Sequence, residues 1–486
     1  MINKSRVHWL NRLNRLRNYL NGQQTIRRRA VPRYLLVGLA GGLLLYFGVA
    51  GAISYSAPWL VRGDTDLHVD YAWRLYHGGI PSRSDGITYQ PFIEQHFNKA
   101  KPQAASKNPP LFYALHAPVV GPLMDRGHWQ TAIALGRTLN LLIGATTILA
   151  LAWGGWLMGG RRRALMALAT PMMAVLIYRY LRLNVDYAVD FLMILIATLS
   201  LIYGYKYLRG GPSRRNFIII SLLAIAGLFT KAAFLGLLPA LAAAVGLAHI
   251  LHGGKDLAAK ILRGLIWSSA FVILVVAATA WYYYLHDYKA SGNWFNTRPS
   301  DFTGGRPLKS LADVLTSSKL WGLFHANYLR DTAVSSLTAM VAAGGAAYRA
   351  WSGHGWLKDK LSLATIGLLA LALMGTLAIQ IGHATGIGSI NFRYLLPALL
   401  PLGLFLAYGL TAWRASRGQL VALVSIVMGV TSIKAYALPG GDNWFDGLYQ
   451  AAAANGLPGA LITLLLISFV IGSFGLVLAL YQLSKD

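Results

Sequence analysis

Residues 34–55 have the sequence YLLVGLAGGLLLYFGVAGAISY, a run of apolar and small residues without a single charge. At the helical rise of 1.5 Å per residue, about 20 such residues cross the hydrocarbon layer of a membrane. A similar run occupies residues 457–480 near the end of the chain. Strands of a membrane barrel would be shorter and would alternate polar with apolar residues, and neither run does. These stretches predict an all-α, polytopic membrane protein.

The composition of the whole chain agrees with this prediction. Of its 486 residues, 55% are hydrophobic and only 13% are charged, about half the charged fraction of a soluble domain. The absence of cysteine excludes disulfides and thiol catalysis. A net charge of +27 would suit a nucleic-acid-binding protein, but the basic residues gather in short connectors between apolar runs. We therefore expect membrane lipids, and no nucleic acid, to face them.

About twelve apolar segments are predicted to be membrane spans, and together they form a single transmembrane domain over residues 34–481. A basic amphipathic helix over 1–33 is predicted to precede them on the cytoplasmic membrane surface. One orientation places both termini and every short basic connector on the same side, which predicts a multi-pass protein of a bacterial inner (cytoplasmic) membrane with cytoplasmic termini. Large external loops are then expected at about 58–127, 286–331 and 438–456. The predicted spans are approximately 34–57, 128–157, 164–181, 187–206, 215–230, 232–250, 263–285, 332–350, 360–382, 393–412, 418–437 and 457–481.

The first external loop begins with an acidic cluster, DTDLHVD at residues 64–70. On a helix, Asp64 and His68 share one face, and Asp66 and Asp70 share another. A carboxylate near the membrane interface can take a proton from an acceptor hydroxyl. A solvated acidic cap on a loop helix accounts for the same residues, because structural charge clusters are also common.

Further ionisable residues fall at membrane depth on the external side. Arg137, Lys231 and Arg393 each interrupt or open an apolar segment. A buried arginine needs an anionic partner, and a phosphate or diphosphate ligand is a candidate in a chain with few acids. For Lys231, an ammonium that extends to the interface is the alternative. A second set lies between the third and fourth spans and either faces a cavity or joins two helices through an Arg–Asp pair: Arg179, Arg182, Asn184, Asp186 and Asp190.

Several short motifs follow one another on the predicted external side. They are Asp64…His68…Gly78-Gly79-Ile80-Pro81, Asn108-Pro109-Pro110-Leu111-Phe112-Tyr113, Arg137-x-x-Asn140, Asn184-x-Asp186, Thr230-Lys231 and Phe392-Arg393-Tyr394-Leu395-Leu396-Pro397. In this order they resemble motifs of the GT-C superfamily of membrane glycosyltransferases. The resemblance covers about residues 64–401 and is strongest to uncharacterised bacterial members, with a more distant likeness to aminoarabinose and protein mannosyl transferases.

The resemblance implies a GT-C-like fold and an inverting glycosyltransferase. Such an enzyme moves a sugar from a polyprenyl-phosphate carrier to a glycan, lipid or protein acceptor of the cell envelope on the external, periplasmic face. The position that matches the family's catalytic base is Asp64. Asp66 is the alternative, because Thr65 stands where the family often has a second acid.

The resemblance also implies ligands for the other motif residues. Arg393, Lys231 and Arg137 would hold the donor phosphate. Some members of the superfamily use a divalent metal, for which Asp64, Asp66 and Asp186 could supply oxygen ligands. The residues expected to contact substrate are His68, Asn108, Tyr113, Asn184, Asp186 and Tyr394.

Two other functions remain open from the residues. A transporter or flippase of a lipid-linked anion would also need arginines in the membrane, but its charges should be distributed on both sides of the pathway. An O-antigen-ligase-like enzyme would use a diphosphate donor and typically has a large loop late in the chain, whereas the largest external loop expected here is the first. There is no P-loop, Rossmann glycine pattern or zinc-type spacing, which argues against a nucleotide-driven pump.

Overall fold

The computed structural model describes residues 32–60, 64–95, 103–184, 186–289, 292, 309–329, 331–352, 359–387, 389–413, 418–435 and 444–485. The surface helix expected at 1–33 lies almost wholly outside these residues, so its existence stays a prediction. Every regular element within the described ranges is a helix, and no strand occurs among them. The predicted all-α class is confirmed.

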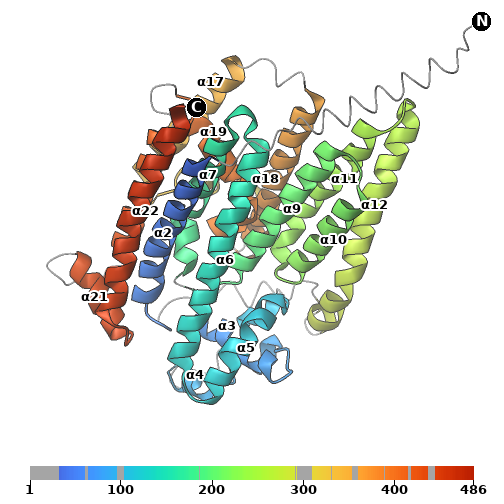
Figure 1. The fold of residues 1–486 in the computed structure, drawn as a ribbon. Helices are drawn as coiled ribbons and strands as arrows, with labels where there is room; N and C mark the ends of the chain where they lie inside the picture. Colours follow the sequence, from blue (N-terminus) through green and yellow to red (C-terminus); the bar gives the residue numbers. More distant parts are fainter. Residues whose placement is uncertain are drawn as a thin grey trace, which may run out of the picture.

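A helix occupies each of the twelve ranges predicted as spans (Figure 1). By length and composition, eight helices of the described chain are able to cross a membrane, or up to nine if one bent pair is a single span. The protein is therefore a polytopic integral membrane protein, and a count of about twelve spans stays a prediction. The twelve helices are α2 (Arg33–Ser56), α6 (Trp129–Met158), α7 (Arg163–Val175), α9 (Asp190–Gly210), α10 (Arg214–Leu228), α11 (Leu238–His252), α12 (Leu257–Tyr282), α17 (Thr332–Ser352), α18 (Lys360–Ile387), α19 (Leu399–Leu410), α20 (Gln419–Lys434) and α22 (Gly459–Lys485).

The first long loop folds into a small helical layer at one end of the bundle (Figure 1). The buried carboxylate of Asp70 organises it by accepting hydrogen bonds from the backbone N–H groups of Thr88 and Tyr89, both at 2.9 Å, and from Nε2 of Gln103 at 2.8 Å. Burial nevertheless raises the pKa of Asp70. The layer comprises α3 (Thr65–Tyr76), η1 (Arg83–Asp85), α4 (Gln90–Gln95), η2 (Ala104–Lys107) and α5 (Leu111–Asp125).

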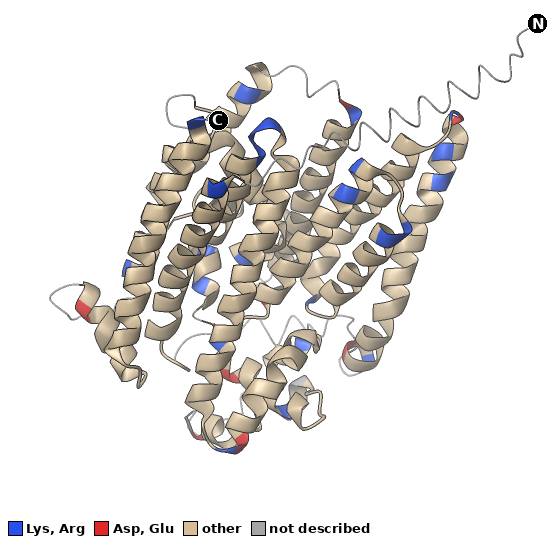
Figure 2. Ribbon diagram, viewed as in Figure 1, with Lys and Arg blue, Asp and Glu red and all other residues tan. Residues whose placement is uncertain are grey.

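Basic residues gather at the opposite end of the bundle from this layer (Figure 2). They include those at the α6–α7 turn, residues 161–163, and those around the α11–α12 turn, residues 255–263. This separation is what the positive-inside rule predicts. The assignment of the basic end to the cytoplasm follows from that rule and stays a prediction.

Several membrane helices have irregular ends near the loop layer. α7 bends by 59° into a short segment formed by α8 (Tyr178–Leu181) and η4 (Arg182–Asn184). The 3₁₀ segments η5 (Ala232–Leu237) and η9 (Phe392–Ala398) precede α11 and α19, and α12 continues as the π-helical η6 (Tyr283–Tyr288). Irregular backbone is tolerated at membrane depth only where protein or a cavity covers it, so these ends indicate where the bundle is lined by polar groups.

Glycines bring the first and last membrane helices, α2 and α22, into backbone contact. A Cβ atom at Gly48 would lie 2.6 Å from the carbonyl oxygen of Leu465, and one at Gly472 would lie 2.3 Å from the backbone nitrogen of Leu45. Such distances are shorter than any normal Cβ contact. Without a hydrophobic driving force in lipid, close backbone packing of this kind holds membrane helices together.

We expect Gly472→Ala to destabilise the protein by about 1–3 kcal/mol, because the added methyl group must separate α2 from α22. The matched control is Gly367→Ala in α18, where a Cβ would meet no atom within 4 Å. Thermal unfolding in detergent should show a lower midpoint for Gly472→Ala and an unchanged or slightly higher midpoint for Gly367→Ala. Equal midpoints for the two variants would show that the α2–α22 contact is not tight.

Candidate active site

Three polar residues meet where α9, α10 and η9 end near the loop layer. The carboxylate of Asp190, the first residue of α9, is completely buried. Nζ of Lys231, which precedes η5, lies 2.7 Å from its Oδ1, and Nη2 of Arg393 in η9 lies 3.5 Å from its Oδ2. Buried charges persist only when they are compensated. The two cations therefore explain why an aspartate is tolerated at this depth.

The two cations are engaged to different degrees. Lys231 donates a hydrogen bond to Asp190, and its Nζ lies 5.6 Å from the ring centroid of Tyr394. Arg393 is in ion-pair range but forms no hydrogen bond with Asp190, and its Nε has no partner among the described residues. Arg393 thus retains guanidinium donors for a ligand, whereas Lys231 is largely occupied by Asp190.

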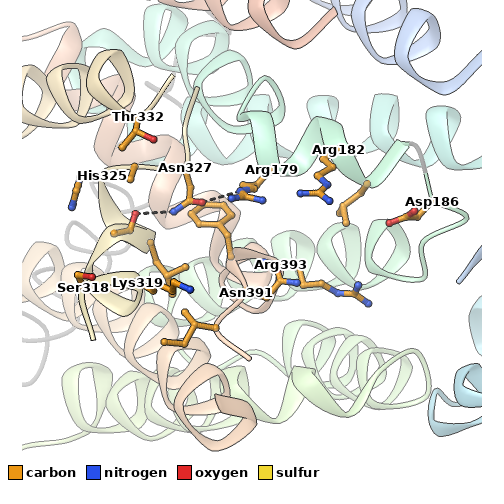
Figure 3. Close-up of a pocket in the computed structure, with 16 residues that line it drawn as sticks. Arg179, Arg182, Asp186, Ser318, Lys319, His325, Asn327, Thr332, Asn391 and Arg393 are labelled. Carbon is orange, nitrogen blue, oxygen red and sulfur yellow. Dashed lines mark hydrogen bonds between the residues drawn. The ribbon is translucent and has the colours of Figure 1, made fainter. Parts of the chain in front are cut away.

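Arg393 also lines a cavity of about 660 Å³ (Figure 3). Figure 3 shows Arg182, Asp186 and Arg393 in one part of this cavity, and His325, Ser318 and Thr332 in another. Four basic side chains and one carboxylate line it, which gives a positive potential suited to an anionic ligand. The charged lining residues are Arg179, Arg182, Lys319, Arg393 and Asp186.

The start of α3 lies beside this cavity. The backbone N–H of Tyr187 donates to Oγ1 of Thr65 at 3.4 Å, which holds Asp64 and Thr65 next to the segment that carries Asp186. Burial raises the pKa of Asp186 to about 6; the charge of Arg393 opposes this shift and that of Asp64 adds to it. An acid from the first loop and an arginine from late in the chain therefore both influence the pKa of the half-buried Asp186 carboxyl group.

Three residues expected to contact substrate lie together. His68 is one turn after Asp64 in α3, Asn108 comes from the segment that leads into α5, and Tyr113 lies in the first turn of α5. His68 Nδ1 is 2.7 Å from the hydroxyl oxygen of Tyr113, and Nδ2 of Asn108 is 3.3 Å from the same oxygen. Burial lowers the pKa of His68 to about 4, and the charges of Asp64, Arg393, Lys231 and Asp190 act on it more weakly. The ring is thus neutral at pH 7 and shares the surroundings of the ion cluster.

The segment that carries Asn108 and Tyr113 is fixed to the bundle beside Lys231. The N–H of Leu111 donates to the carbonyl oxygen of Phe229 at 3.1 Å, two residues before Lys231. This bond brings the Pro-Pro-Leu element of the first loop to the end of α10.

Arg137 lies in different surroundings from the other predicted phosphate ligands. It is buried in α6, and its guanidinium donates to the backbone carbonyls of Ser54 at 2.7 Å, Ala57 at 2.9 Å and Pro58 at 3.0 Å. These carbonyls lie at the C-terminal end of α2, where backbone acceptors lack helical partners. The geometry favours a structural role for Arg137, and phosphate binding by it stays a prediction without a supporting contact.

The remaining predicted residues do not line the cavity. Asp66 is buried and accepts a hydrogen bond from the N–H of Leu67, and Asn184 donates to the carbonyl of Leu181. No group of three or more His, Cys, Asp or Glu residues in the described ranges could hold a metal ion. Asp64, Asp66 and Asp186 therefore do not form the three-carboxylate metal site that the resemblance allows.

Residues of the loop between α12 and α17 complete the cavity, and the sequence analysis did not single them out. Asn327 accepts a hydrogen bond from Nε of Arg179 at 2.9 Å, and Lys319 and His325 lie on the same wall. They belong to or flank α16 (Ser318–Trp321) and η7 (Gly322–Phe324). No motif or spacing distinguishes these residues from other loop positions. The prediction that their loop lies on the same side of the membrane as the first loop was the single indication.

No protein-family model matches the chain, and no curated protein matches it either. Two solved structures are similar, both crystal structures of ArnT from Cupriavidus metallidurans. The structure bound to undecaprenyl phosphate is 14% identical, with a TM-score of 0.48, over 94% of this chain and 78% of that one. The apo structure is 15% identical, with a TM-score of 0.49, over 91% of this chain and 76% of that one. At this level of overlap, neither neighbour assigns a function to the chain.

We expect Lys231→Met to lower the free energy of unfolding by about 3 kcal/mol or more, because it removes the hydrogen-bonded partner of a buried carboxylate. The double variant Lys231→Met/Asp190→Leu should be more stable than Lys231→Met alone, since the buried carboxylate that has lost its hydrogen-bonded partner is then removed as well. Thermal unfolding in detergent measures both. A double variant less stable than Lys231→Met would show that the two residues do not form a coupled pair.

We also expect acid to destabilise the protein through His68. The unfolded histidine binds a proton below about pH 6.5, whereas the folded one does so only below about pH 4. Between these values the unfolded state binds more protons, so stability falls as the pH falls. The contribution at pH 4.5 is about 2 kcal/mol.

The measurement for His68 compares unfolding midpoints at pH 7 and pH 4.5. His68→Gln should show a smaller acid-induced drop than the wild type. His77→Gln, which changes an exposed histidine just after the same helix, should behave like the wild type. An equal drop in all three proteins would contradict a neutral, buried His68.

Proposed function

We propose that the chain is an inverting glycosyltransferase of the GT-C type. It would transfer a sugar from a polyprenyl-phosphate carrier to an acceptor of the cell envelope, on the external face of a bacterial inner membrane. The proposal rests on the geometry of the site together with the order of the sequence motifs.

One observation carries the proposal. Asp186 and Arg393 line one part of the same cavity. Asp64 lies at this site as well, because Thr65, the next residue, accepts a hydrogen bond from the N–H of Tyr187. An acid and a guanidinium with free donors thus lie at one site, beside a cavity with four basic side chains. A transfer from a lipid-linked phosphate requires this combination of a proton acceptor and an anion-binding cation.

The chemistry follows from these charges. Asp64 would take the proton of an acceptor hydroxyl while the oxygen of that hydroxyl attacks the anomeric carbon of the sugar. The bond between that carbon and the phosphate oxygen breaks, and the phosphate leaves with the electron pair. Arg393 would stabilise the charge that builds up on the leaving phosphate, and Lys231, which is paired with Asp190, would add to this positive potential. A single displacement of this kind inverts the anomeric configuration.

The distribution of charge supports an enzyme over a transporter. Asp190, Lys231 and Arg393 all lie at the ends of their elements near the first-loop layer. A pathway through the membrane would need charged groups along its length.

We expect Asp64→Asn to lower kcat by about 100-fold or more, because the amide cannot accept the hydroxyl proton. The assay uses purified protein in proteoliposomes with a panel of undecaprenyl-phosphate-linked sugars and mixed envelope glycolipids as acceptors. Asp313→Asn is the matched control and should keep wild-type activity, because it changes an exposed capping-box residue in the first turn of α15 (Leu311–Thr316).

Asp66→Asn separates the two candidate bases. Full activity of Asp64→Asn together with loss of activity in Asp66→Asn would transfer the role to Asp66. Full activity of both variants would remove the acid-base part of the proposal. Movement of a polyprenyl-linked substrate across the membrane without any transfer product would favour a flippase instead.

A further inference from the structure

A chain of hydrogen bonds with a defined direction leads to His68. Nδ2 of Asn108 lies 3.2 Å from the carbonyl oxygen of Ala105 and 3.3 Å from the hydroxyl oxygen of Tyr113. A backbone carbonyl can only accept, so the amide nitrogen of Asn108 faces it, and the second proton of this nitrogen is directed to Tyr113.

The hydroxyl group of Tyr113 continues this chain of hydrogen bonds from donor to acceptor. A tyrosine hydroxyl has one proton to donate, and its contact with Asn108 is one in which its oxygen accepts. Among the described residues the single acceptor within reach of that proton is Nδ1 of His68 at 2.7 Å, so we assign the proton to this bond. Nδ1 is then an acceptor without a proton. In a neutral imidazole the proton must therefore be on Nε2.

Packing holds this arrangement in place. Tyr113 is completely buried, and the ring of Tyr71 stacks on it at a centroid distance of 3.7 Å. His68 is 5% exposed, so water competes poorly for its Nδ1. Burial also lowers the pKa of His68 to about 4, which keeps the ring neutral.

Nε2 of His68 has no protein partner in the described part of the chain, where the bond from Tyr113 is the single hydrogen bond of the ring. The charges that act on this ring are those of Asp64, Arg393, Lys231 and Asp190. A third cation beside Arg393 and Lys231 would be repelled by them. A neutral N–H group can donate to a phosphate oxygen between these cations without that repulsion.

We propose that His68 donates its Nε2 proton to an oxygen of the phosphate group held by Arg393, and that Tyr113 and Asn108 are positioning residues that fix this tautomer. The inference deepens the proposed function and rests on it. It assigns Asn108 and Tyr113 an indirect role in place of the substrate contact expected from the sequence.

The first experiment compares two amides at position 68. Glutamine places its amide nitrogen near the position of Nε2, and asparagine places it near Nδ1. With decaprenyl phosphate as the probe, measured on purified protein by native mass spectrometry, His68→Asn should weaken binding by about tenfold or more. His68→Gln should retain most of the affinity, and His77→Asn, at the exposed residue that follows the same helix, is the control.

The second experiment tests whether Tyr113 acts through His68. Tyr113→Phe should weaken binding of decaprenyl phosphate severalfold in the wild type, because either ring nitrogen can then hold the proton. In a His68→Ala background the same substitution should have no further effect. Tyr89→Phe removes another buried hydroxyl of the first loop, which donates to the carbonyl of Met124, and should leave binding unchanged.

The outcomes separate this inference from the proposed function. Absence of decaprenyl phosphate binding by the wild type would overturn both. Wild-type binding with equal affinities of His68→Asn and His68→Gln would overturn only the role of His68. A loss of binding by Tyr113→Phe that persists in the His68→Ala background would show that Tyr113 contacts the ligand itself.

Discussion

The buried carboxylate of Asp190 is the constraint on which the candidate site depends. A single negative charge in this environment must be compensated, and its two partners come from sequence positions far from it and from each other. Their requirement to meet fixes the start of α9, the end of α10 and the register of η9 relative to one another. The same requirement places two cations beside this carboxylate, at the end of the bundle that carries the loop layer. The site is therefore a consequence of how one charge is accommodated inside a membrane protein.

Backbone groups that the irregular helix ends leave available join separate segments of the chain, and one of these bonds attaches the loop layer to the bundle. The N–H of Leu111 bonds to the carbonyl of Phe229, the hydroxyl of Tyr283 donates to the carbonyl of Leu228 at 2.7 Å, and the N–H of Tyr178 donates to the carbonyl of Tyr328 at 2.7 Å. Regular helices would use many of these groups internally. The breaks thus let loops and membrane helices share hydrogen bonds, and the polar side chains of both are placed against one another.

The sequence predicts where the helices lie, but it does not predict the irregular structure at their ends. Apolar length alone predicted all twelve helical ranges, because in lipid every backbone group must be satisfied within its own segment. The order of motifs pointed to Asp64, His68, Tyr113, Asp186 and Arg393, which the fold brings into one region. The 3₁₀ start of η9 and the bend after α7 were not predictable, because they depend on partners from distant segments. For the same reason the sequence did not show that Lys231 is occupied by Asp190, or that Arg137 binds the end of α2.

The glycine contact between α2 and α22 has a consequence for biosynthesis. During translation α2 enters the membrane long before α22, so the narrow face around Gly41 and Gly48 has no final neighbour until α22 has left the ribosome. In that interval this face is covered by lipid or by the insertion machinery. The α2–α22 contact therefore forms only after both helices have been inserted, and a chain truncated before residue 459 would leave α2 without this packing partner.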